Sequence, residues 1–266
     1  MKRFDFLLFH RTLEQSEACR DAGVDGIILD LELHGKEQRQ LGFDTEINTH
    51  QLDDISSVKT HVGGPVLCRV NGPSPATPQE IDAVLAAGAD EVIVPMIRSL
   101  QDARLAVDAV AGRARVTLMI ETAEALGIVE GLCALPVDRI YVGLNDLQIS
   151  CGHASIFSPL ANTALGRVRT SAGGLSFGFG GLTVPHRGHP LPARHLYGAM
   201  ARLGCDFSFL RRSFYRDVDA ADYQGAVDAM RREMVRAQSR VPAEVESDYL
   251  SLKQAVAHME AAHDAP

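Results

Sequence analysis

Short apolar runs alternate with longer amphipathic segments along the whole chain. The apolar runs are nearly continuous instead of alternating with polar residues, which is typical of parallel strands covered on both faces. Eight strands are therefore predicted, at Phe6–Phe9, Gly26–Glu32, Pro65–Asn71, Glu91–Ile97, Val116–Thr122, Arg139–Asp146, Leu175–Thr183 and Asp206–Phe214.

The segments between the strands have helical periodicity, and many of them end at a glycine, a common residue after a helix. The predicted helices are Thr12–Ala22, Pro78–Ala87, Ser99–Ala111, Ala123–Leu135, Pro159–Ser171, Pro192–Leu203, Asp219–Arg240 and a last one at about Glu244–Ala262. Eight strand–helix units predict a single-domain (β/α)8 barrel over residues 1–266, with the last helix as an addition that packs on its own barrel or on a neighbouring subunit. A doubly wound open sheet is the alternative, but no G-x-G-x-x-G follows the first strand.

Composition narrows the class of protein. The chain has 266 residues, a formal net charge of −8 and no long Lys/Arg tract, so we expect no nucleic-acid partner. No apolar run has the length of a membrane span, and the N-terminal one is too short for a signal peptide. The five cysteines have neither zinc-site nor redox spacing. We therefore expect a cytoplasmic protein with no membrane partner.

Two carboxylates, Glu121 and Asp146, each close a predicted strand. A buried carboxylate must be paired, protonated or bound to metal, because an isolated buried charge is too costly. Two of them on successive strands predict a shared divalent cation; a structural ion pair or a helix N-cap is the alternative. Active sites of barrels lie at the carboxyl ends of the strands, and His10 and Arg69 also fall there.

Asp30 and Glu32 are two residues apart on the second predicted strand, so their side chains point to the same side. If that side is the barrel interior, they could hold waters of the metal. The alternative is a structural tie to Arg69 or Lys36. Arg69 itself either stabilises a negatively charged oxygen of the substrate or forms a buried salt bridge with Asp30 or Glu32, and both can hold at once. The long irregular segment that follows, Leu33 to His50, is of a kind that is often functional.

Five motifs together resemble the class II pyruvate aldolase and citrate lyase beta-subunit family, with matching order and spacing over roughly residues 20 to 150. They are Ile28-Leu29-Asp30-Leu31-Glu32, Leu67-Cys68-Arg69-Val70-Asn71, Gly88-Ala89-Asp90-Glu91-Val92-Ile93-Val94-Pro95-Met96, Met119-Ile120-Glu121-Thr122 and Val142-Gly143-Leu144-Asn145-Asp146-Leu147. The resemblance implies a carbon–carbon lyase that acts on a small 2-oxo acid through a metal-bound enolate. It also implies a homo-oligomer, a trimer or a hexamer.

The same resemblance implies roles for individual residues. Glu121 and Asp146 would bind Mg²⁺ or Mn²⁺, and Arg69 would face the enolate oxygen. The backbone around Gly143, Leu144 and Asn145 would hold the substrate carboxylate.

The chain departs from the family pattern at the general base. Leu33 takes the place of the His of the aldolases and of the Asp of citrate-lyase-like members, and the histidine follows at His34. The proton shuttle is therefore His34, His10 or a metal-bound water. Two alternative functions remain. One is a citrate-lyase-like acyl-CoA lyase or thioesterase, for which the basic segment 211–216, with Arg211, Arg212 and Arg216, would bind the nucleotide. The other is a non-catalytic binding barrel that lost its general base.

Overall fold

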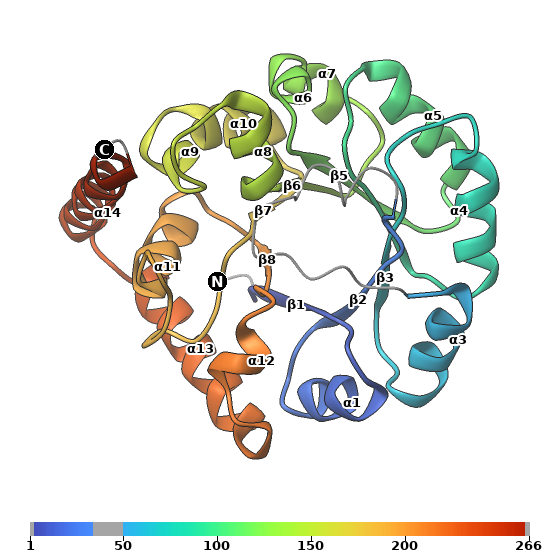
Figure 1. Ribbon diagram of the computed structural model, residues 1–266, viewed down its shortest axis with the longest axis horizontal. Helices are drawn as coiled ribbons and strands as arrows, with labels where there is room; N and C mark the ends of the chain where they lie inside the picture. The colour runs from blue at the N-terminus through green and yellow to red at the C-terminus, as the bar shows by residue number, and fades with distance from the viewer. Residues whose placement is uncertain (1–2, 34–49, 264–266) are drawn as a thin grey trace.

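A closed parallel barrel forms the centre of the protein. In the computed structural model, which describes residues 3–33 and 50–263, eight strands pair in chain order and the eighth returns to the first (Figure 1). The strands are β1 Asp5–Phe9, β2 Gly26–Asp30, β3 Val66–Arg69, β4 Glu91–Val94, β5 Arg115–Ile120, β6 Arg139–Val142, β7 Ser176–Phe179 and β8 Phe207–Phe209. This arrangement confirms the predicted (β/α)8 barrel.

Helices surround the barrel on its outside (Figure 1). Local sequence explains several of their starts: Ser99 and Asp102 form a reciprocal capping box at α5, and a proline opens α4. The helices are α1 Leu13–Asp21, α3 Leu52–His61, α4 Thr77–Ala86, α5 Leu100–Val110, α6 Ala123–Gly127, α7 Val129–Cys133, α8 Leu144–Cys151, α9 Ser158–Ala161, α10 Ala164–Ala172, α11 Ala193–Arg202, α12 Phe214–Asp217, α13 Tyr223–Gln238 and α14 Pro242–His263, with a 3₁₀ turn η1 at Ala220–Asp222.

The apolar core has two parts, because successive side chains of a strand point to opposite faces. Leu118 and Ile120 of β5 point outward into the layer between barrel and helices, whereas Met119 points into the barrel. The barrel interior contains Leu7, Ile28, Leu67, Ile93, Met119, Tyr141, Phe207 and Phe209. This packed interior separates the two ends of the barrel, so a site at one end has a rigid floor.

A charged cluster closes the amino-terminal end of the barrel. Glu91 is fully buried, accepts a hydrogen bond from the Thr117 hydroxyl, and lies 3.5 Å from Arg115 and 3.6 Å from Arg139. Burial raises the pKa of Glu91, and Arg139 opposes that rise. The charges at this end bear on the stability of the fold, because the active site of such barrels lies at the opposite end.

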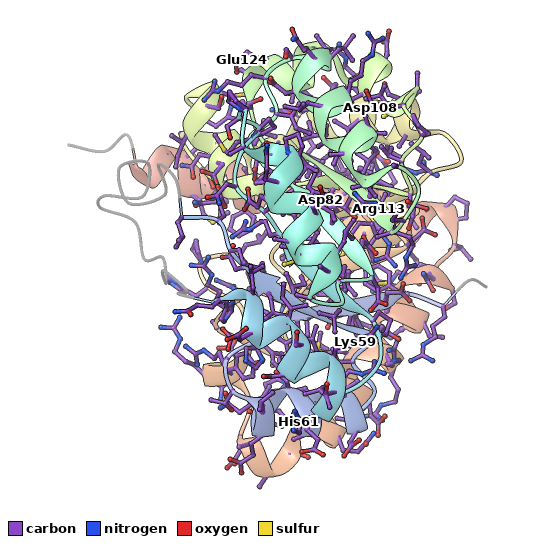
Figure 2. The ribbon with its side chains drawn as sticks, turned by 90° about the vertical axis from the view of Figure 1, so that its right-hand side faces the viewer. Lys59, His61, Asp82, Asp108, Arg113 and Glu124 are labelled. Atoms are coloured by element: carbon purple, nitrogen blue, oxygen red, sulfur yellow. The ribbon has the colours of Figure 1, made fainter. Side chains whose placement is uncertain are left out.

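The outer faces of α3, α4 and α5 carry charged side chains, several of which are labelled in Figure 2. Arg113 contacts Asp82 at 2.6 Å, and Lys59 contacts Asp90 at 2.5 Å. These pairs are exposed, so each contributes little to stability. These exposed charged pairs indicate that this side of the molecule faces solvent.

The last helix, α14, packs on α11 and α9 of the same chain (Figure 1). Its Leu252 and Val256 side chains are buried, the Tyr249 hydroxyl donates to the carbonyl of Ala161 at 3.4 Å, and Ser158 hydrogen-bonds to Glu260. Within the described residues, no helix combines the length and the apolar character needed to cross a membrane.

The structure corrects several predicted boundaries. The first predicted strand ends at Phe9 as observed, but each of the other seven runs too far at its carboxyl end, and residues 144–151, partly predicted as the sixth strand, form α8. The predicted helix 123–135 is two short helices that meet at Ile128, and 159–171 is likewise divided between α9 and α10. Helix α3 was not predicted. Apolar residues continue past several strands, as at Leu31 after β2 and Val70 after β3, because the loops above a barrel also have a buried side.

Candidate active site

A cavity of about 290 Å³ opens at the carboxyl ends of the strands. Its floor is aromatic, and its walls are charged: Glu121 and Asp146 come from the β5–β6 side, and Arg69 comes from β3. The volume is near the lower end for small-molecule sites. The cavity therefore brings together, among the described residues, the three side chains on which the sequence-based prediction depended.

Glu121 comes directly after β5 and is held from two sides. Its Oε1 accepts the backbone N–H of Met96 at 2.8 Å, and Met96 has a positive φ of 53°, which is unusual for a residue with a side chain. The next residue, Thr122, caps α6 and donates its hydroxyl to the carbonyl of Ile97 at 2.5 Å. Since strained backbone persists only where its surroundings require it, this geometry indicates that the position of Glu121 is tightly specified.

Asp146 does not end a strand, so that part of the prediction is wrong. Strand β6 ends at Val142, and Asp146 lies in the first turn of α8. A carboxylate there interacts favourably with the positive end of the helix dipole. The turn at Gly143 nevertheless places Asp146 in the same cavity as Glu121. No side chain caps α8 at Gly143, and the first N–H groups of a helix have no acceptor within it.

The carboxylates repel each other in a poorly hydrated place. Burial, followed by the charges of Asp146 and Glu32, raises the pKa of Glu121 to about 8, although Arg69 and the N–H of Met96 act to lower it. Glu121 is only 2% exposed, so solvent offers it little charge stabilisation. A bound cation would offset this repulsion directly.

Gly143 makes room for Glu121. A Cβ atom added at this position would overlap Oε2 of Glu121 and would lie 3.0 Å from its Cβ and 3.2 Å from Cε of Met119. The backbone angles of Gly143, φ −84° and ψ 95°, suit any residue. The glycine is therefore needed for space and not for conformation.

The two carboxylates fit a hard divalent cation. Mg²⁺ prefers oxygen ligands and is commonly held by one or two carboxylates, with waters and substrate filling the remaining positions. Among the described residues, no group of three or more His, Cys, Asp and Glu side chains is arranged to hold a metal ion. The site therefore suits an ion that shares its coordination with substrate, and it does not suit a closed structural zinc site.

Arg69 is held by a buried ion pair. Its Nε and Nη2 donate to Oδ1 and Oδ2 of Asp30 at 2.9 and 2.7 Å, and Nε lies 3.5 Å from Glu32. Burial alone would lower the pKa of Arg69, but Asp30 and Glu32 raise it well above its usual value. The salt-bridge alternative is thus observed, and Arg69 also lines the cavity. A guanidinium has five N–H donors, so Arg69 can pair with Asp30 and still donate to another group.

Two histidines lie near each other beside Asp30 and its strand, and one of them, His50, was not predicted. His50 accepts the backbone N–H of Asp30 on its Nδ1 at 2.9 Å, and its ring centre lies 5.3 Å from that of His10. Nδ1 of His10 lies 2.8 Å from Oγ of Ser16. Burial, and then the charge of His50, lower the pKa of His10 to about 4, and Asp54 opposes this. His10 is buried and is not among the cavity-lining residues.

The position of the family's general base is occupied by Leu33. This side chain is half exposed, and its N–H donates to the side-chain oxygen of Asn71 at 2.9 Å. His34, the nearest candidate base in the sequence, lies outside the described residues, as does Lys36.

The aromatic floor was also not predicted as part of the site. The ring of Tyr141 stacks on that of Phe209 with centroids 3.8 Å apart, and Phe9 meets Phe209 edge to face at 6.0 Å. All three line the cavity. The sequence held one indication for Tyr141. It lies two residues before Gly143, so the two residues share a face of the extended chain.

The carboxyl end of β8 supplies a basic wall. Arg211, Arg212 and Arg216 all line the cavity. The guanidinium of Arg212 lies 3.8 Å from Asp30 and 6.0 Å from the centre of the Phe9 ring. We call the segment 211–216 the arginine wall; its Arg212 lies beside the Asp30–Arg69 pair.

Fold and cavity together define a (β/α)8-barrel protein with acidic and basic groups gathered at the carboxyl ends of its strands. A family sequence profile described as HpcH/HpaI aldolase/citrate lyase matches residues 10–171. The chain belongs to this family, and membership supports an enzyme of the lyase type; the family is generally dependent on divalent metal.

Solved structures agree on the fold. An HpcH/HpaI aldolase/citrate lyase family protein from Burkholderia cenocepacia J2315 is 20% identical, with a TM-score of 0.59 over 89% of this chain and 95% of that one. RipC from Yersinia pestis is 20% identical, with a TM-score of 0.57 over 91% and 98%. The citrate synthase SbnG is 18% identical, with a TM-score of 0.59 over 82% and 91%. A search among curated proteins finds no significant match.

Proposed function

We propose that this protein is a divalent-metal-dependent carbon–carbon lyase of the aldolase type, acting on a small 2-oxo acid. The observation that carries the proposal is the placement of Glu121, Asp146 and Arg69 on one cavity. Family membership supports the lyase class. The metal, Mg²⁺ or Mn²⁺, and the substrate belong to the proposal.

Cleavage of a carbon–carbon bond beside a carbonyl leaves an enolate, so the site must stabilise negative charge on oxygen. Glu121 and Asp146 would hold the cation, which when bound supplies a Lewis acid for that charge. Arg69, oriented by Asp30, offers N–H donors to the same oxygen. The N–H groups of Leu144 and Asn145 at the start of α8 would hold the substrate carboxylate, because helix N-termini bind anions.

Three groups are candidates for the proton shuttle: His34, His10 and a water on the metal. A direct role of His10 would require a relay, since it does not line the cavity. Its pKa, lowered to about 4, keeps the imidazole neutral at neutral pH and makes it a weak base there.

Decarboxylation of oxaloacetate tests the enolate site, because losing CO₂ leaves the same kind of enolate. We expect slow turnover with Mg²⁺ above the rate without protein, and loss of that turnover with EDTA or in Glu121→Gln. Glu124→Gln is the matched control: Glu124 lies three residues on, at the outer surface, where it pairs with Arg98 at 2.5 Å (Figure 2). Turnover that survives EDTA would refute the mechanism.

The two other functions leave distinct signatures in the same experiment. An acyl-CoA lyase or thioesterase would release free thiol from a CoA ester, and its rate would depend on Arg211, Arg212 and Arg216. A binding barrel would take up Mg²⁺ and a 2-oxo acid without turnover of either substrate class. The proposed lyase predicts turnover of the oxo acid alone.

A further inference from the structure

The hydroxyl of Tyr141 is a polar group at the cavity that the protein itself does not pair. Tyr141 is only 5% exposed and lines the cavity, and within the described part of the chain its hydroxyl makes no hydrogen bond. The hydroxyls of Tyr197 and Tyr215, in contrast, each donate to a backbone carbonyl, at 2.9 and 2.8 Å. Since an unpaired buried hydroxyl costs free energy, the Tyr141 hydroxyl calls for a partner from outside the protein.

The fold keeps a place for this hydroxyl. The Tyr141 ring stacks on Phe209 with centroids 3.8 Å apart and on Phe207 at 6.0 Å, which limits its movement. Gly180, also at the cavity, makes room for the hydroxyl: an added Cβ would overlap the Tyr141 oxygen and would lie 3.4 Å from Cζ of the ring. Gly180 has no positive φ, so its backbone suits other residues. The glycine is therefore needed for space, and the space that it leaves is filled by the hydroxyl.

The charges around the hydroxyl locate it within the site. Burial raises the pKa of Tyr141, the positive charge of Arg69 opposes this, and the negative charge of Glu121 adds to the rise. The phenol thus keeps its proton at neutral pH and is a hydrogen-bond donor instead of a base. Arg69 and Glu121 are also the two residues between which the proposed function places the oxo oxygen of the substrate, because Arg69 faces that oxygen and Glu121 holds the cation.

We infer that the Tyr141 hydroxyl donates a hydrogen bond to the oxo oxygen of the substrate, beside Arg69, and is a further catalytic residue. This inference rests on the proposed function, which supplies the 2-oxo acid and its placement. The oxygen gains negative charge as the carbon–carbon bond breaks, so a donor aimed at it binds the charged form more tightly than the uncharged one. The proton stays on Tyr141 in this step, and the general base is a separate group.

The test removes the hydroxyl and compares two ligands. Tyr141→Phe keeps the stacked ring, oxalate resembles the charged enolate, and pyruvate is the uncharged oxo acid at the same position. Both ligands are titrated calorimetrically into the protein with Mg²⁺. We expect oxalate to bind about 10- to 100-fold more weakly to Tyr141→Phe, the range for a hydrogen bond to a charged group, and pyruvate to lose less than about 10-fold. For oxaloacetate, kcat should fall by about 10²–10³ with little change in KM.

Stability separates this role from a structural one. The hydroxyl of Tyr141 has no partner within the described residues, so Tyr141→Phe without ligand or metal should unfold at the same urea concentration as the wild type or at a higher one. Tyr197→Phe is the matched control. Its hydroxyl donates to the carbonyl of Thr183, and Tyr197 is not among the cavity-lining residues, so the unfolding midpoint should fall while both ligand affinities stay unchanged.

Gly180→Ala tests the place of the hydroxyl from the other side. The new Cβ should displace the Tyr141 oxygen and weaken oxalate binding, as Tyr141→Phe does. In the Tyr141→Phe background the overlapping oxygen is absent, so the added Gly180→Ala should weaken oxalate binding little further. Such non-additivity is expected when two substitutions act through one group.

The outcomes distinguish this inference from the proposed function. Unchanged oxalate binding in Tyr141→Phe, or an equal loss for oxalate and pyruvate, would overturn the role of Tyr141 and leave the lyase proposal intact. Binding of neither ligand by the wild type with Mg²⁺ would overturn the proposed function and, with it, this inference.

Discussion

At the scale of single residues, the site is a balance of buried charges. Among the described residues, Glu121 has two acidic neighbours, Asp146 and Glu32, and one basic neighbour, Arg69, which pairs with Asp30. Breaking a buried pair by removing one partner typically costs several kcal/mol, because the remaining charge has no compensation. The arrangement therefore disfavours the ionised form of Glu121 unless a further cation lies beside it.

The pH dependence of stability tests this balance. The pKa of Glu121 is raised from its ordinary value of 4.5 to about 8, so its contribution is fully present below pH 4.5 and is lost as the pH rises through 8. Without metal, the free energy of unfolding should fall across this window, by on the order of a few kcal/mol. Mg²⁺ replaces the proton, and its stabilising effect should increase toward pH 8.

Urea unfolding between pH 5 and 9, with EDTA and with Mg²⁺, measures both effects. Glu121→Gln cannot ionise and should flatten the metal-free profile, whereas Glu124→Gln should follow the wild type. A wild-type profile without this fall in EDTA would mean that Glu121 is ionised in the empty site.

At the scale of elements, the sequence predicts the number and order of the strands better than the residues at which the strands end. The eight strands follow from their apolar runs, but apolar residues continue into the loops, so β6 was extended to Asp146 although it ends at Val142. The cavity still contains Asp146, because a single turn at Gly143 returns the chain over the barrel. Partners distant in the sequence, such as Met96 for Glu121, could not be predicted, since they arise from backbone geometry.

His50 and the aromatic floor were missed for a related reason. His50 matters through one hydrogen bond to the backbone of Asp30, twenty residues earlier, which no local pattern indicates. Tyr141 and Phe209 come from strands on separate parts of the chain and meet only when the barrel closes. The roles of Arg69 and Asp30 were more accessible, because neighbouring strands bring them opposite each other.

The turn between β6 and α8 offers a direct test of how elements position the acids. In Gly143→Ala the new Cβ would overlap Oε2 of Glu121, so the carboxylate must move. We expect an intact fold, because the backbone angles at Gly143 suit alanine, together with a loss of Mg²⁺ affinity of about tenfold or more, as for changes beside metal ligands.

Gly166→Ala in α10 is the matched control. A Cβ there meets nothing within 4 Å, and alanine favours helix, so stability should rise by about 0.5–1 kcal/mol without any change in Mg²⁺ affinity. Calorimetric titration with Mg²⁺ and thermal unfolding of both variants give the comparison. Unaltered Mg²⁺ binding in Gly143→Ala would show that Glu121 is not a metal ligand.

At the scale of the whole molecule, the barrel and α14 form one packed unit in the structure. The helix buries Leu252 and Val256 against its own chain and leaves Leu250 half exposed. The predicted trimer or hexamer remains a prediction. If α14 packed on a neighbouring subunit, the side of the helix that is exposed in the single chain would be buried in that contact. The two leucines, two positions apart, lie on different sides of the same helix and so separate the two arrangements.

Replacing these leucines by alanine distinguishes internal from external packing. Leu252 is 1% exposed, so Leu252→Ala should lower the free energy of unfolding by about 2–5 kcal/mol, through lost burial and the cavity left behind. Leu250 is 51% exposed, and Leu250→Ala should change it by less than about 0.5 kcal/mol. Denaturant unfolding at two protein concentrations measures both. If Leu250→Ala were as damaging as Leu252→Ala, and its midpoint depended on protein concentration, α14 would be packing on a neighbouring subunit, because only association makes stability depend on concentration.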